Sequence, residues 1–174
     1  AQGGLGWYMV RSGLAVRTEV SAYRLAAHLA LALTILVIAL WTWADLNPRR
    51  EEARADSRWR WAVFGVVSLL AVTVVSGAFV AGLRGGKVFN EFPLMGGRLV
   101  PEGYLAMAGL WTNAFENPVA AQFHHRVLAT LTGLASLGLA WRARPDVLGE
   151  YGAMAVRLFG LTIAAQFALG VATI

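Results

Sequence analysis

Two long runs without a charged residue constrain this chain more than any other feature. Residues 25–44 and 61–83 contain no Asp, Glu, Lys or Arg. About 20 apolar residues cross the hydrocarbon core of a bilayer as a helix, in which every backbone polar group is paired. Further apolar stretches follow at 118–141 and 158–174, and residues 1–10 read as the end of another helix. The sequence therefore predicts an all-α fold, a polytopic transmembrane helical bundle.

The composition agrees with a surface covered by lipid. Of the 174 residues, 57% are hydrophobic and only 14% are charged, whereas soluble domains carry about 25% charged residues. There is no Cys, which excludes disulfides, iron–sulfur clusters and covalent haem attachment through C-x-x-C-H. The net charge is +5, and no basic run stands apart from the apolar segments, so we expect no nucleic-acid partner.

The distribution of Arg predicts the orientation of the helices. Residues 45–60 carry five Arg and residues 142–157 carry three more, so we expect both links to face the cytoplasm. Tryptophans typical of a membrane interface lie at the same ends: Trp41, Trp43, Trp59, Trp61 and Trp141. The link 84–120 is then extracytoplasmic. It is too apolar for a disordered linker, and we expect it to fold as a cap over the bundle.

A short repeat predicts how the chain is organised. Gln2–Gly6 and Gln166–Gly170 share the pattern Q-x-x-L-G, each late in an apolar helix. If the repeat unit is four spans long, both copies run in the same direction. The matching helices would lie before Ala1 and after Ile174, which suggests the middle of a longer protein. The expected domains are the end of an N-terminal four-helix unit (1–45), a cytoplasmic link (46–60) and most of a C-terminal four-helix unit (61–174) with the cap 84–120.

The histidines are the candidate functional residues. His28 and His125 each lie near the outer end of an apolar stretch, and ionisable residues within spans usually face the bundle interior. They could ligate haem iron, or simply donate to backbone carbonyls at the interface. Adjacent helical residues point about 100° apart, so only one of His124 and His125 can face the core. Arg24 lies one turn before His28 and could pair with a haem propionate, or extend to the interface.

Specific motifs make the chain resemble haem A synthase, in the branch of mitochondria and alphaproteobacteria. The matching segments are QGGLGWYMVRSGL, YRLAAHLALA, EFPLMGGRLVPEG, WTNAFENPVAAQFHHR and QFALGVATI. The resemblance implies a pseudo-symmetric pair of four-helix bundles, each holding a haem between two histidines. It also implies an enzyme that oxidises a ring methyl of haem O, its substrate, to the formyl of haem A for terminal oxidases, with haem b (iron) as cofactor.

The resemblance also assigns roles to individual residues. His28 matches the second His of the N-terminal pair and is taken as a catalytic residue and iron ligand at the substrate site. His125 matches the first His of the C-terminal pair, where haem b is expected, and Arg24 and Arg126 are the expected haem-binding neighbours. The family typically has Asp where this chain has His124, so the ligand could be either neighbour, and the F-x-H-R register favours His125. The partner ligands, and an early Glu of the family, fall outside residues 1–174.

The same resemblance implies location and partners. We expect an integral protein of the bacterial cytoplasmic (inner) membrane, or of the mitochondrial inner membrane, surrounded by lipid bilayer. Haem O synthase, oxidase assembly factors and further copies of the chain are the expected protein partners, and these 174 residues alone are expected to be inactive.

Other interpretations of the same residues stay open. A dihaem electron-transfer subunit and a transporter with histidine proton relays are the alternative functions. Glu91, Glu102 and Glu116 of the cap could act as acid–base groups or be ordinary solvated carboxylates. Small residues along the helices, including Gly6 and Gly77, could serve helix packing or the close approach of a macrocycle.

Overall fold

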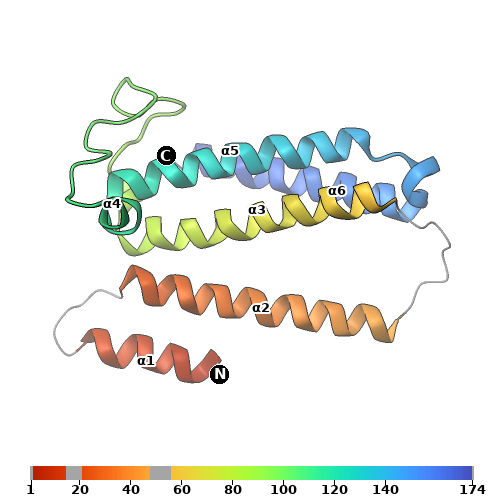
Figure 1. Ribbon diagram of the computed structural model, residues 1–174, viewed down its shortest axis with the longest axis horizontal. Helices are drawn as coiled ribbons and strands as arrows, with labels where there is room; N and C mark the ends of the chain where they lie inside the picture. Colours follow the sequence, from red (N-terminus) through yellow and green to blue (C-terminus); the bar gives the residue numbers. More distant parts are fainter. Residues whose placement is uncertain (1, 15–20, 48–55, 174) are drawn as a thin grey trace. The chain divides into compact units, whose positions relative to one another are not determined.

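The computed structural model describes residues 2–14, 21–47 and 56–173, and all of its regular elements are helices (Figure 1). They are α1 (Gln2–Leu14), α2 (Ala22–Leu46), α3 (Ser57–Gly82), the 3-10 turn η1 (Gly85–Lys87), α4 (Leu110–Glu116), α5 (Pro118–Arg142) and α6 (Pro145–Ala172). The described residues form no strand, apart from one isolated bridge between Met95 and Arg98. The predicted all-α fold is confirmed. Part of the expected cytoplasmic link 46–60 lies outside the described residues.

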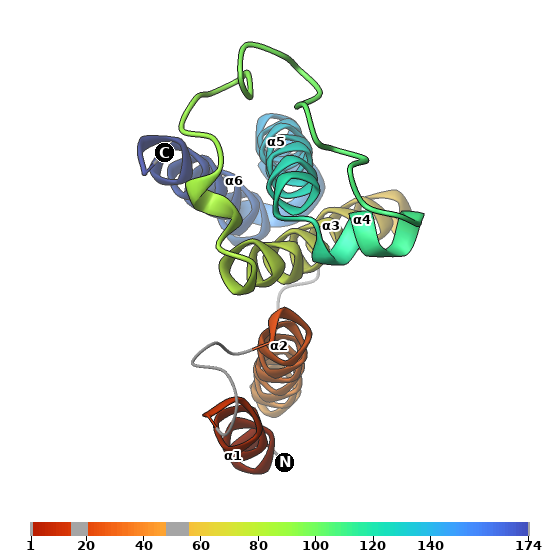
Figure 2. The ribbon, with the colours of Figure 1, turned by 90° about the vertical axis from the view of Figure 1, so that its left-hand side faces the viewer.

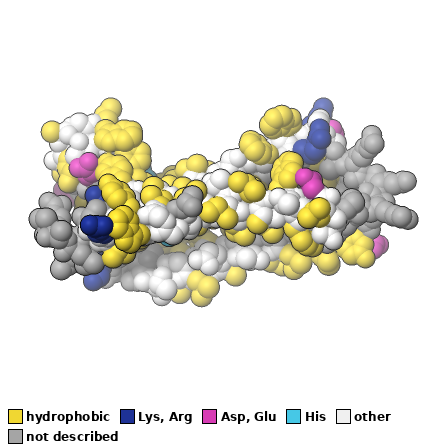
Figure 3. Space-filling model, turned by 90° about the horizontal axis from the view of Figure 1, so that it is seen from below, with side chains coloured by type: hydrophobic (Ala, Val, Ile, Leu, Met, Phe, Trp, Pro, Cys, Tyr) yellow, Lys and Arg dark blue, Asp and Glu magenta, His cyan; other side chains and the backbone are white. Residues whose placement is uncertain are grey.

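Within the described part of the chain, three helices are long and apolar enough to cross a membrane: α2, α3 and α6. They correspond to three of the four expected spans. The fourth, α5, has a similar length, but it is not among the helices apolar enough to cross a membrane. The polar residues His124, His125 and Arg126 lower its mean hydropathy. Hydrophobic side chains are spread along the face shown in Figure 3, whereas its charged side chains lie toward the two ends. Many large apolar residues of α2 and α6 are exposed. Exposed apolar helices of this length need lipid around them, so the chain is an integral membrane protein.

Helix α6 begins earlier than the apolar stretch at 158–174 suggested. Pro145 occupies the first turn, where its missing N–H costs no hydrogen bond. The negative charge of Asp146 in the same turn interacts favourably with the positive N-terminal end of the helix dipole. Gly149 has a φ of 71° and interrupts the helix, a conformation that glycine adopts without steric cost. Much of the expected cytoplasmic link 142–157 is therefore helical.

The chain divides into two compact units, which are described separately: Ala1–Pro48 with Val74–His125, and Arg49–Thr73 with Arg126–Ile174. In the first unit, α1 lies beside α2, as Figures 1 and 2 both show. The start of α2 meets the end of α3 very closely, because a Cβ added at Gly82 would lie 2.6 Å from the Cα of Ala22. Tyr23 packs edge-on against Phe79, with ring centroids 5.5 Å apart. The first unit thus places the start of α2, the helix of His28, beside the end of α3.

The second unit is held by small and hydroxyl side chains between its helices. The hydroxyls of Thr73 in α3 and Thr132 in α5 are hydrogen-bonded at 2.7 Å. A Cβ added at Gly160 of α6 would lie 2.6 Å from the Cβ of Ala140, so the glycine permits α5 and α6 to approach closely. Such contacts are typical of helix association in membranes, where burial of apolar surface supplies little driving force.

Candidate functional site

His28 lies on α2 and contacts the amide of Gln2 on α1. The Gln2 Nε2 donates to the Nε2 of His28 at 3.1 Å and to the backbone oxygen of His28 at 3.2 Å. Because an amide nitrogen only donates, the histidine Nε2 accepts, and the neutral ring then carries its proton on Nδ1. Among the described residues, neither His28 Nδ1 nor Gln2 Oε1, both buried, has a hydrogen-bond partner. This corner of the first unit therefore holds two unsatisfied polar atoms.

A glycine faces the same imidazole. A Cβ added at Gly6 would lie 3.4 Å from the Cε1 of His28. One turn earlier on α2, the guanidinium of Arg24 lies over the ring of Tyr8, 5.0 Å from its centroid. α1 thus places Gln2 and Gly6, both members of the repeated motif, against the expected ligand, and Tyr8 against Arg24.

His125 has a different polar partner. Its Nδ1 is hydrogen-bonded to the hydroxyl of Ser76 on α3 at 2.8 Å. The following residue, Gly77, faces the ring so closely that an added Cβ would lie 3.0 Å from Cε1. A hydrogen bond at Nδ1 fixes the orientation of an imidazole and favours Nε2 as the nitrogen that binds a metal. Arg126, the next residue of α5, is half-buried.

His124 is directed toward the loop that precedes α4. Its Nε2 is hydrogen-bonded to the hydroxyl of Tyr104 at 2.8 Å, and the two rings meet edge-on with centroids 5.4 Å apart. Sequence reasoning could establish that the neighbours point in different directions, but not which one meets the loop. The contact with Tyr104 supports the choice of His125 as the ligand.

Two asparagines of the W-x-N-x-F-E-N motif fasten the loop of residues 88–109. Asn113 is only 4% exposed. It accepts from the backbone N of Met107 at 3.0 Å and donates to the backbone oxygens of Met107 and Gly109. Gly109 has a φ of 91°, which lets the chain turn sharply into α4. The motif, a strong signal in the sequence, thus has a structural use at this position.

Asn117 joins the loop to the start of α5. It is 3% exposed, donates to the backbone oxygen of Gly103 at 2.7 Å, and accepts from the backbone N of Val119 at 2.9 Å. The second contact caps the first turn of the helix that carries His124 and His125.

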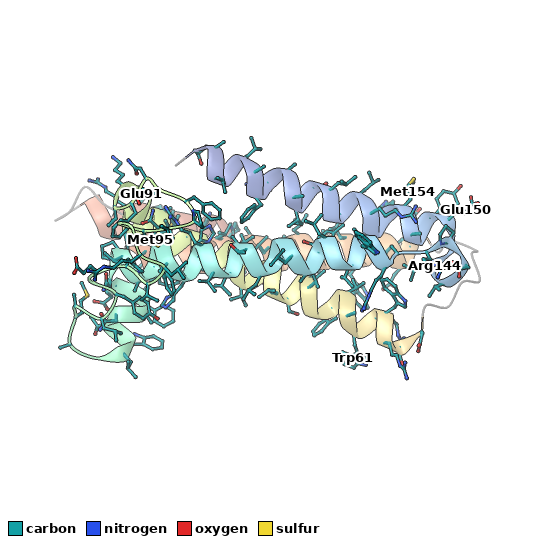
Figure 4. All side chains as sticks on the ribbon, turned by 90° about the horizontal axis from the view of Figure 1, so that it is seen from above. Trp61, Glu91, Met95, Arg144, Glu150 and Met154 are labelled. Carbon is teal, nitrogen blue, oxygen red and sulfur yellow. The ribbon has the colours of Figure 1, made fainter. Side chains whose placement is uncertain are left out.

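The three cap carboxylates are exposed, and each has a partner. Glu91, labelled in Figure 4, accepts from the backbone N of Gly97 at 3.2 Å. Glu102 pairs with Arg98 at 3.1 Å, and Glu116 accepts from the hydroxyl of Tyr23 at 3.1 Å. The contacts of Glu91 and Glu102 are local to the loop, whereas Glu116 ties α4 to the start of α2.

Neither histidine belongs to a cluster of metal-binding side chains among the described residues. The described residues contain no group of three or more His, Asp or Glu that could hold a metal ion. The partners of the two histidines, Gln2 and Ser76, were not expected from the sequence. Gln2 did belong to the repeated motif, whereas nothing distinguished Ser76 from other serines in apolar helices.

The whole chain matches one family, described as cytochrome oxidase assembly protein, over residues 1–174. It is 43% identical over 178 residues to the haem A synthase of Rhodospirillum centenum, covering 99% of this chain and 46% of that protein. The haem A synthase of Parvibaculum lavamentivorans is 41% identical, with 99% of this chain and 49% of the relative covered. That of Maricaulis maris is 38% identical, with 100% and 50% covered. The chain spans about half the length of the curated relatives it matches, and no solved structure matches it.

Proposed function

Because the chain belongs to the cytochrome oxidase assembly protein family, we propose that it supplies one histidine to each of two haem sites in a haem A synthase. The reaction is the oxidation of a ring methyl of haem O to the formyl of haem A. The observation that carries the proposal is that His28 and His125 are each hydrogen-bonded by a neighbouring helix and faced by a glycine. Each glycine lets its helix approach the imidazole closely, which helps to hold the ring in place.

The residues around His125 fit a resident haem b. Ser76 is hydrogen-bonded to Nδ1, so Nε2 is the nitrogen that would ligate iron, and Gly77 lets the ring pack closely against α3. Arg126 is placed in sequence to neutralise a propionate, a charge that arginine pairs with well. The hydrogen bond from the neighbouring helix keeps the ring from rotating, which preserves the ligand geometry.

The residues around His28 fit a haem that binds and leaves. Its Nε2 already accepts a hydrogen bond from Gln2, and the lone pair that accepts this bond is the one that iron uses. Arg24 lies on the same face of α2, one turn away, and could pair with a propionate. We take His28 as the catalytic residue, because it would contact the substrate iron directly. Gln2 would release Nε2 when haem O binds.

The protein's share of the chemistry is binding, orientation and exclusion of water. Haem supplies the redox chemistry when it is bound. The apolar surface of the helices would retain a lipophilic haem within the membrane, and the segment 84–120, held by Asn113 and Asn117, would cover the bundle on its extracytoplasmic side. The domain division at 1–45, 46–60 and 61–174 belongs to the same proposal. We place the protein in the bacterial inner membrane, with haem O synthase, oxidase assembly factors and further copies of itself as partners.

Product analysis tests the proposal. The intact protein is expressed in cells that make haem O, and the extracted haems are separated by chromatography. The proposal predicts haem A, and none in cells without the protein. If the purified protein carries haem and yet only haem O and haem B are found, the alternative of a dihaem electron-transfer subunit replaces it. If the purified protein binds no haem, both the synthase and the electron-transfer subunit are contradicted. The transporter with histidine proton relays is then the remaining alternative.

A further inference from the structure

A groove of about 190 Å³ lies between the start of α3 and the end of α5, within the second unit. Arg58, Trp59 and Ala62 line it from α3, and Leu139 and Arg142 line it from α5. Its floor is apolar, and both of its arginines are exposed. Figure 4 marks this region by Trp61 near the start of α3 and by Arg144 just beyond the end of α5.

The two arginines of the groove differ from other arginines of the second unit. Arg144 pairs with Asp146 at 3.4 Å, and Arg157 donates to the backbone oxygen of Ala143 at 2.8 Å. Among the described residues, Arg58 and Arg142 have neither an ion pair nor a side-chain hydrogen bond. Two guanidinium groups on neighbouring helices are therefore available to the same external anion.

The position of the groove limits which anion can reach it. α3 is a helix long and apolar enough to span the membrane, so its first turn lies near the lipid headgroups. The N-terminal end of a helix adds a partial positive charge, and Trp59 is typical of the interface between lipid and water. Basic pockets between membrane helices suit anionic headgroups. A soluble phosphate would gain nothing from the apolar floor of Ala62 and Leu139.

We propose that this groove binds an anionic phospholipid, with its phosphate between Arg58 and Arg142 and an acyl chain along Ala62 and Leu139. Arginine pairs with phosphate through two parallel hydrogen bonds, which gives a directed contact rather than general attraction. The site belongs to the end of α5 opposite His125 and does not depend on haem chemistry.

The test compares two double variants of the intact protein that lose the same charge. R58Q/R142Q removes the groove arginines, whereas R60Q/R144Q removes two arginines of the same segments that do not line the groove. Each protein is placed in phosphatidylcholine nanodiscs containing a minor fraction of phosphatidylglycerol, and retained lipids are counted by native mass spectrometry. The buffer contains enough salt to screen diffuse attraction. Each arginine near anionic lipid contributes about a factor of five in affinity, so R58Q/R142Q should lower phosphatidylglycerol retention roughly thirtyfold.

The control should stay within about threefold of the unaltered protein, because screened and distant charges contribute little. The single variants R58Q and R142Q, compared at equal helix content by circular dichroism, should each lower retention about fivefold. Equal losses in the two double variants, equal retention of phosphatidylcholine, or unchanged retention in R58Q/R142Q would each overturn the proposal. Displacement of the lipid by inorganic phosphate or by an acidic peptide would overturn it as well, because the groove would then serve a soluble anion.

Discussion

His28 and His125 occupy the same unit, yet the polar atoms around them are satisfied to different extents. The hydroxyl of Ser76 holds the Nδ1 of His125. The amide of Gln2 holds the Nε2 of His28 instead, and leaves His28 Nδ1 and Gln2 Oε1 buried without partners among the described residues. A buried polar atom without a partner costs about 1–3 kcal/mol. A ligand that rearranges the Gln2–His28 pair can recover part of this free energy.

The difference suggests how one chain can serve two haems with different residence times. Around His125, the hydrogen bond with Ser76 of α3 already orients the ring, as the proposed resident haem would require. Around His28 the nitrogen that would bind iron is occupied by a hydrogen bond that can be exchanged. This comparison underlies our assignment of a resident haem b to His125 and of the substrate to His28.

The largest effect should follow from His125→Ala in the intact protein. Loss of an axial ligand should lower haem b affinity more than about a hundredfold, since even the loss of a partner of a ligand costs ten- to a hundredfold. The optical spectrum should leave the low-spin, six-coordinate form. His124→Ala is the matched variant: its ring contacts Tyr104, so it should keep the spectrum. The reverse result would move the ligand to His124.

A smaller effect is expected from Asn117→Ala. This substitution should weaken the first turn of α5, the helix that carries His125. The change removes the contacts with Gly103 and Val119 and leaves part-buried backbone groups without these partners, at a cost of about 1–2 kcal/mol. The thermal unfolding midpoint of the protein in detergent should fall accordingly. Asn90→Ala, at an exposed loop asparagine, should leave it unchanged. Equal midpoints for the two variants would show that the loop does not stabilise α5.

The fold was predictable where local composition decides it. Uncharged runs identified α2 and α3 because a membrane helix satisfies its own backbone. The start of α6 was missed, since the Pro145–Asp146 signal lies in a charged stretch that also fits a cytoplasmic link. The irregular loop before α4 depends on contacts of Asn113 and Asn117 with residues up to 14 positions away, which no periodic pattern reveals.

The candidate site was predictable only in part. Helical geometry shows that His124 and His125 point apart, but choosing between them requires the position of Tyr104, 20 residues earlier. The partner of His28 is 26 residues away on another helix. The partner of His125 is 49 residues away. Such pairs arise from how helices pack, and a single sequence carries no direct record of packing.

A pair of partner variants sharpens the comparison further. Ser76→Ala should lower haem b affinity roughly tenfold, because it removes the hydrogen bond that orients the ring of His125. The amount of haem A formed per bound haem b should not change, because His28 keeps its own partner. Gln2→Ala should raise haem A formation when haem O is limiting, at unchanged haem b content, because haem O no longer has to displace the amide from the Nε2 of His28. Spectral titration and chromatography of extracted haems measure the two quantities. Ser68→Ala, on the same helix as Ser76, is the control. If both partner variants changed the same quantity, the two histidines would not serve separate sites.

The smallest effects should come from the two glycines. Alanine stabilises a helix by about 1 kcal/mol relative to glycine. At Gly6 the added Cβ would make an almost ordinary contact with His28, whereas at Gly77 it would press on His125 at 3.0 Å. Gly6→Ala should therefore raise the unfolding midpoint slightly, as should the control Gly65→Ala, which has open space. Gly77→Ala should not raise it, and should alter the low-spin electron paramagnetic resonance signal of haem b. An equal rise in all three would show that His125 moves freely.

The most direct test of two separate sites is the haem content of His28→Ala in the intact protein. The variant is extracted at normal yield, its haem b is measured from the reduced-minus-oxidised spectrum, and its extracted haems are separated by chromatography. His28 and His125 have different hydrogen-bond partners, and sites that share no partner act nearly independently. The account therefore predicts haem b close to that of the unaltered protein and no haem A. Loss of haem b from the well-folded variant would mean that His28 and His125 share one haem, and normal haem A output would remove His28 from the reaction.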